Sequence, residues 1–340
     1  MRRLPILATA LLVSASGVRA DVPNIVVDIP PVFSLVSSVM QGVGTPKLLL
    51  RGNESPHNFA LRPSQRRDLG QADIIFWIGE GLTPWLEKAQ ASLTQTPISV
   101  ALGEQTGVVQ LSFREGAFFE ARDERDEHDE HDEVNGHTEH NHAETHENAA
   151  AHDGKDHQDH AGHDHSGLDP HFWLDPENAI HWIYTIADIL SQTDPENAGT
   201  YYANATRTKA SLELLNKNIA QQMAPHRAER FLIVHDAFQY FEARFGLAAQ
   251  GAISDGHAAP PSAARILAIR KLMQNQKISC VFAEPGYNAK LLDNLISETS
   301  VRLKQLDPLG AGLPLDHTLY EAVLQNMADT MVACFTNNEG

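Results

Sequence analysis

Histidine, the side chain that most often binds metals at neutral pH, is concentrated in one acidic segment of this chain, residues 120–166. Eleven of the 18 histidines lie there, and acidic residues rather than large apolar ones fill the gaps between them. These histidines are His128, His131, His137, His140, His142, His146, His152, His157, His160, His163 and His165. Imidazole and carboxylate groups are both ligands for divalent metals such as Zn²⁺. A segment so poor in apolar surface cannot offset the entropy cost of folding, so we expect a disordered loop that gathers metal ions. The alternative is an acidic linker without a metal role.

The spacing of these histidines is irregular and contains no fixed frame of ligands. Irregular spacing predicts several weak, interchangeable sites, because each binding event must order the flexible chain again. The loop is therefore expected to collect metal without determining which metal is finally held. A selective site needs ligands on rigid elements, and we look for it elsewhere in the chain.

Negative charge is concentrated in the same segment. The whole chain has a formal net charge of −18, and residues 120–169 contain seventeen acidic residues against three basic ones. A local negative field raises the concentration of cations nearby. Nucleic-acid binding requires a basic face instead. The charge pattern favours cation collection and argues against a nucleic-acid partner.

The first twenty residues have the pattern of a secretory signal peptide. Two arginines follow Met1, an apolar run extends over residues 4–13, and a small residue, Ala20, precedes Asp21. The apolar run is too short for a permanent membrane anchor. We therefore expect a mature chain that starts near Asp21 and is soluble in the periplasm.

The chain contains two cysteines, Cys280 and Cys334. In an oxidising compartment such a pair most simply forms one disulfide bond. The alternative is a pair of thiolate metal ligands, for which closer spacing is usual.

Short apolar runs alternate with helical patterns on both sides of the acidic segment, which predicts an α/β fold with parallel sheets. The expected strands cover residues 24–29, 47–50, 73–78, 98–102, 231–234, 247–253, 280–283 and 301–306. A pattern with few breaking residues follows Asp194 and predicts one long rigid helix over 195–224. We expect this helix to join an N-terminal lobe (21–194) to a C-terminal lobe (225–340).

Ligands of parallel α/β sheets bind beyond the carboxyl ends of the strands. Four side chains follow predicted strands or open a helix at equivalent places in the two halves: His57, His171, His235 and Asp307. Three imidazoles and one carboxylate would form a near-tetrahedral metal site in the cleft between the lobes. Taken singly, each histidine is more often a hydrogen-bonded loop residue, and Glu284 has a position similar to that of Asp307. The remaining histidines are interpreted as surface or structural residues: His181, His226, His257 and His317.

The segments that carry these four residues resemble, in order, the ligand motifs of the periplasmic proteins and lipoproteins that deliver metals to ABC importers. They are SPHNFALRPS (55–64), DPHFWLDP (169–176), VHDAF (234–238) and LDPLG (306–310). The likeness extends over nearly the whole mature chain, and the branch it resembles is the zinc-specific one, the zinc-uptake binding proteins of the ZnuA type. Manganese-preferring relatives are expected to have Glu at the position of His235, and a site richer in nitrogen favours zinc.

This resemblance implies Zn²⁺ as the bound ion, with His57, His171, His235 and Asp307 as its ligands. It also implies a membrane permease with a cytoplasmic ATPase as the partner. Some zinc members have Glu directly before the first ligand histidine, whereas this chain has Pro56. The fourth ligand therefore stays open between Asp307, which we prefer, Glu54 and water.

The sequence thus predicts a monomeric protein without enzymatic activity that captures Zn²⁺ and delivers it to an ABC permease. One alternative is a zinc-dependent hydrolase with Glu242 or Glu284 as general base, although the chain contains no His-Glu-x-x-His motif. Another is a manganese-binding or metal-buffering relative, or a surface adhesin without a transporter.

Overall fold

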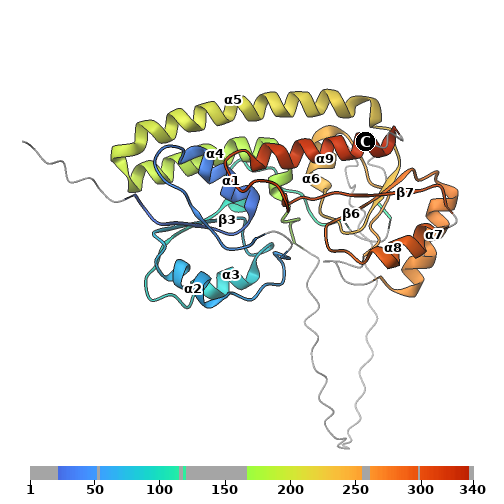
Figure 1. The fold of residues 1–340 in the computed structure, drawn as a ribbon, viewed down its shortest axis with the longest axis horizontal. Helices are drawn as coiled ribbons and strands as arrows, with labels where there is room; N and C mark the ends of the chain where they lie inside the picture. The colour runs from blue at the N-terminus through green and yellow to red at the C-terminus, as the bar shows by residue number, and fades with distance from the viewer. Residues whose placement is uncertain are drawn as a thin grey trace, which may run out of the picture.

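The computed structural model describes residues 22–51, 54–114, 118–119, 167–254, 261–297 and 299–336. The expected signal peptide, His257 and the acidic segment with its eleven histidines lie outside these residues. Within them, two parallel sheets flanked by helices confirm the predicted α/β class (Figure 1). None of the helices described has the length and apolar character needed to cross a membrane.

The first sheet has the strand order β2-β1-β3-β4, with all neighbouring strands parallel. Its strands are β1 (Ile25–Val27), β2 (Lys47–Leu48), β3 (Ile74–Trp77) and β4 (Ile98–Ala101). Alternate side chains of β1 and β3 enter two separate cores, as the pleat requires. The flanking helices are α1 (Pro30–Val39) and α4 (Pro176–Thr193) on one face, and α2 (Pro63–Gly70) and α3 (Pro84–Gln90) on the other.

The second sheet has the order β5-β6-β7, again parallel. Its strands are β5 (Phe231–Ile233), β6 (Cys280–Ala283) and β7 (Arg302–Gln305). Helices α6 (Gln239–Phe245) and α9 (Leu319–Phe335) cover one face, and α7 (Ala263–Asn275) and α8 (Ala289–Ile296) cover the other. The predicted disulfide between Cys280 and Cys334 is confirmed, and it joins the central strand β6 to α9.

A long helix, α5 (Ala198–Met223), runs along both halves at the top of Figure 1. It packs against α4 and α1 of the first half and against α9 and α6 of the second, and 3-10 turns at 195–197 and 224–226 flank it. Helix α9 also packs on α1, so the last helix of the chain contacts the first half. One core cluster consequently extends through both halves. The role of α5 as a rigid link and the lobe boundaries at 194 and 224 stay predictions.

One predicted strand is wrong. Residues 247–253 lie beside β5 but form only isolated bridges, from Ala252 to Ile233 and from Gly251 to Phe118. On their outer side the carbonyl groups of Ala252 and Ile253 accept hydrogen bonds from the guanidinium of Arg265. A side chain takes the place of a further strand there, so the sheet does not extend beyond this segment.

Candidate metal centre

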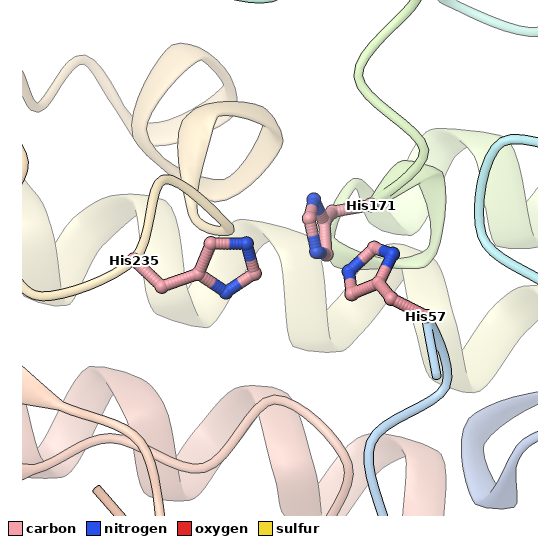
Figure 2. Close-up of side chains that lie close together, drawn as sticks. All are labelled: His57, His171 and His235. Atoms are coloured by element: carbon pink, nitrogen blue, oxygen red, sulfur yellow. The ribbon is translucent and has the colours of Figure 1, made fainter. Parts of the chain in front are cut away.

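Three histidines from separate segments lie close together (Figure 2). His57 lies in the loop between β2 and α2, His171 opens the 3-10 turn Phe172–Leu174, and His235 follows β5. Their ring centroids are 5.1–5.7 Å apart, and one ring nitrogen of each lies within 4.8 Å of the other two. Three imidazole nitrogens this close together could hold one metal ion.

His171 is fixed by a carboxylate two residues ahead of it. Its Nδ1 lies 2.6 Å from Asp169 Oδ1, and its backbone N–H donates to the same oxygen at 3.0 Å. The two residues are 2% and 1% exposed. Burial raises the pKa of Asp169 to about 7, while the His171 backbone N–H and Arg114 oppose this rise. When Asp169 is ionised, it favours the tautomer of His171 in which Nε2 is the nitrogen that can bind a metal.

His235 has a comparable partner in Glu284, whose Oε1 lies 3.0 Å from its Nδ1. Burial opposes protonation of His235, but the charge and hydrogen bond of Glu284 outweigh it, so the pKa of His235 is raised. The pKa of Glu284 is lowered: burial acts to raise it, and the nearby His235 and His171 outweigh that effect. Glu284 therefore orients the ring of His235 in the way that Asp169 orients that of His171.

The loop that carries His57 is fastened to its own half. The indole Nε1–H of Trp85 donates to Pro56 O at 2.7 Å, and Trp85 also packs on Phe59 with ring centroids 5.2 Å apart. These contacts hold the backbone on both sides of His57. Unlike the other two histidines, His57 is only partly buried.

Three carboxylates line the same cavity of about 450 Å³: those of Glu54, Glu284 and Asp307. None of them belongs to the group formed by the three histidine nitrogens. Asp307 Oδ1 accepts the N–H groups of Leu309 and Gly310, both at 2.9 Å. Burial raises the pKa of Asp307 and these hydrogen bonds oppose the rise. Asp307, the preferred fourth ligand, is thus near the histidines but engaged in its own turn.

The carboxylate of Glu54 is also engaged. It forms an ion pair with Arg62 and accepts the N–H of Arg51 at 3.0 Å. The second acid considered as a hydrolytic base, Glu242, is 2% exposed and pairs with Arg114. A general base must reach the metal-bound water, and both Glu242 and Glu284 are already bound to other side chains.

Three of the other histidines lie away from this cavity. His181 and His317 are exposed, and His226 stacks on Phe335 with ring centroids 5.6 Å apart. Their placement agrees with a surface or structural role. Sequence reasoning did not assign a role to Asp169, although an acid two residues before a candidate ligand was a usable signal.

The segment around His171 is held by the second half of the molecule. Trp173 Nε1–H donates to Pro308 O at 2.8 Å, and the Tyr320 hydroxyl donates to Trp173 O at 2.7 Å. The Tyr240 hydroxyl donates to Asp169 O at 2.9 Å. His171 therefore belongs to the first half by sequence but is positioned largely by residues of the second.

The comparisons with known proteins agree with this geometry. Residues 25–334 match the family model described as "Zinc-uptake complex component A periplasmic", ZnuA. The chain belongs to the ZnuA family. It is 42% identical over 330 residues to the High-affinity zinc uptake system protein ZnuA of Paracoccus denitrificans (strain Pd 1222), with 97% of each chain covered. The family is periplasmic and supplies a binding component for zinc uptake, which is a transport function rather than an enzymatic one.

Solved structures of ZnuA proteins share the fold. One described as "Crystal structure of ZnuA" matches with a TM-score of 0.68 and 23% identity, covering 91% of this chain and 99% of that chain. A ZnuA deletion mutant with zinc bound matches with a TM-score of 0.68 and 22% identity, covering 92% and 98%. The α/β class and the family resemblance that the motifs predicted are thereby confirmed.

Proposed function

We propose that this protein captures Zn²⁺ outside the cytoplasm and delivers it to an ABC permease, with His57, His171 and His235 as the ligands. The observation that carries the proposal is the group of three imidazole nitrogens within 4.8 Å of one another. Membership of the ZnuA family and the zinc-bound state of a structural relative support zinc as the cargo. A ligand set with three imidazole nitrogens also favours zinc over manganese.

Two carboxylates prepare this site for a metal. Asp169 and Glu284 each bind the Nδ1 of one histidine, which leaves the Nε2 atoms of His171 and His235 for the ion. Asp307 is the preferred fourth ligand because it lines the cavity, and water is the alternative. The Arg62 and Arg51 contacts of Glu54 make it a weaker candidate.

The acidic segment 120–166 is proposed as an accessory collector. Its eleven histidines would bind zinc weakly and pass it to the cleft by ligand exchange. We further propose export by the N-terminal signal peptide, a monomeric mature protein without nucleic-acid partners, and docking on a permease whose ATPase drives import. Family membership supports the transporter partner.

A competitive zinc titration of the mature chain tests the proposal. We expect the His235→Ala variant to lose tight binding. The matched control, His317→Ala, should bind like the wild type, because His317 lies at the surface against Gln41. Manganese should bind the wild type far more weakly than zinc. Equal zinc affinity in His235→Ala and the wild type would overturn the assignment.

A further inference from the structure

A buried ion-paired cluster lies beside the candidate metal centre, around Arg114. Nη1 and Nη2 of Arg114 donate to the two oxygens of Glu242 at 2.7 and 3.0 Å. Nε donates to Asp236 Oδ2 at 3.0 Å, and Nη2 also binds Asp236. The side chains of Glu242 and Asp236 are 2% and 17% exposed. A guanidinium that forks onto two largely buried carboxylates fixes their relative position, which a single point charge does not do.

The residues just before Arg114 are paired with the segment that carries His171. Ser112 forms an antiparallel bridge with Leu168, and the N–H of Asp169 donates to Leu111 O at 2.8 Å. Asp169 in turn binds the ring of His171. A shift of residues 111–114 would therefore be transmitted directly to the carboxylate that orients this ring.

The side chain of Arg114 is attached to the segment that carries His235. Asp236 is the next residue along the chain, and Glu242 lies on α6, the helix that follows. Glu242 Oε2 also accepts the N–H of Ala249 at 2.8 Å, beside the residues that run along β5. Arg114 thus binds both the turn after His235 and the helix behind it.

A ring contact extends this connection. The Arg114 guanidinium carbon lies 3.9 Å from the centroid of Phe119, whose N–H donates to Gln250 O at 3.1 Å. The residues on both sides of positions 115–117 are therefore fastened to the second half of the molecule. This is where the chain leads from the first half toward the acidic segment.

We propose, on the basis of the zinc-binding function proposed above, that Arg114 is a positioning residue for the metal centre. It braces the His171 segment against the His235 turn and so sets the separation of the two rings, 5.1 Å between centroids, at a value that suits one zinc ion. It acts through Asp236 and Glu242 on one side and through the pairing of residues 111–113, which precede it, on the other. It does not touch the metal.

The first test is a competitive zinc titration of the mature full-length chain. Arg114→Gln should weaken zinc binding about 10- to 100-fold, the usual effect of removing a group that orients metal ligands. Arg114→Lys should recover part of the loss, because it keeps the charge but not the fork. The matched control is Arg302→Gln. Arg302 lies on β7, and its guanidinium donates to Cys334 O at 2.9 Å. This variant should bind zinc like the wild type.

The second readout is the visible absorption of Co²⁺ bound in place of zinc, which reports ligand geometry. A purely structural role would lower the folded fraction but leave the spectrum of the bound sites unchanged, whereas a positioning role changes the spectrum in Arg114→Gln. If that variant does not fold, the neutral variant Arg114→Gln/Asp236→Asn/Glu242→Gln replaces it, because it removes the brace without leaving unpaired buried charges.

Weakened zinc binding with an altered Co²⁺ spectrum in the folded variant supports the proposal. Zinc affinity within about twofold of the wild type, less than 0.5 kcal/mol, overturns it, as does an unchanged spectrum. A wild-type chain without tight zinc binding would instead overturn the proposed function, so the two failures are distinguishable.

Discussion

The two ligand-bearing segments of the first half are held in different ways. His171 is 2% exposed, and its segment hydrogen-bonds to Pro308, Tyr320 and Tyr240 of the second half. His57 is partly buried in a loop fastened by Trp85 to its own half. The site thus combines two imidazoles that are held firmly in place, those of His171 and His235, with a third, that of His57, which comes from a peripheral loop. We therefore expect both His57 and His171 to contribute to zinc binding, but only His171 to contribute to the stability of the fold.

The largest effect is expected when His171 is compared with His57. Each Ala variant should lose zinc affinity on the order of 1,000-fold, about 4 kcal/mol, because each loses one of three imidazoles. Only His171→Ala should also lower the unfolding free energy, by about 1–3 kcal/mol, since Asp169 loses a buried hydrogen-bond partner. Zinc titration and urea unfolding of the metal-free proteins measure both. Equal loss of stability in the two variants would contradict the comparison.

The next prediction uses Asp28, a buried acid that directly follows β1 and does not line the cavity of the candidate metal centre. Asp28 accepts the N–H groups of Ile29 and Ile78 at 2.8 and 2.9 Å, and burial raises its pKa from 3.8 to about 7 despite these bonds. The folded state thus binds this proton more tightly than the unfolded state. The protonated carboxyl of Asp28 therefore stabilises the fold by on the order of 4 kcal/mol. This stabilisation is complete below pH 3.8 and is lost as the pH rises through about 7.

Asp28→Asn removes this titration. The unfolding free energy of the wild type minus that of Asp28→Asn should therefore fall between pH 4 and pH 8, in metal-free protein unfolded by urea. Zinc affinity should not change. A difference that is flat with pH would show that Asp28 is ionised in the fold at all these pH values.

Asp169 is the contrasting buried acid, because it binds a candidate ligand. Asp169→Asn should weaken zinc binding about 10- to 100-fold, since the neutral amide makes the His171 ring a poorer donor to the metal. Isothermal titration with a competing chelator would measure the change. Unaltered affinity would mean that the Asp169–His171 contact serves the fold rather than the metal.

The smallest effect is expected in the loop around His57. Trp85→Phe removes the bond to Pro56 O but keeps an aromatic ring against Phe59, so zinc binding should weaken about fivefold, roughly 1 kcal/mol. Trp77→Phe is the matched control, because its indole also makes one hydrogen bond, to Ser99 Oγ at 3.0 Å. The control should leave zinc affinity unchanged. Equal losses in both variants would show a general effect on the first sheet.

Much of the fold could be predicted because each half alternates short β-branched strands with helices. The regular strand predicted over 247–253 was wrong, because this segment runs beside β5 but pairs with it only through an isolated bridge. The convergence of His57, His171 and His235 followed from their position after strands or before a helix. The bond between Asp169 and His171 joins residues only two positions apart and could have been predicted. The brace formed by Arg114 could not, because it joins residues distant in sequence.

The central claim is that selective zinc binding belongs to the cleft and not to the acidic segment. The most direct test is a competitive zinc titration of the mature chain with residues 120–166 removed. We predict one remaining tight site with the affinity of the full chain, and its loss when His171→Ala is added to the deletion. Loss of all tight binding on deletion alone would place the zinc site in the acidic segment and contradict the assignment of His57, His171 and His235.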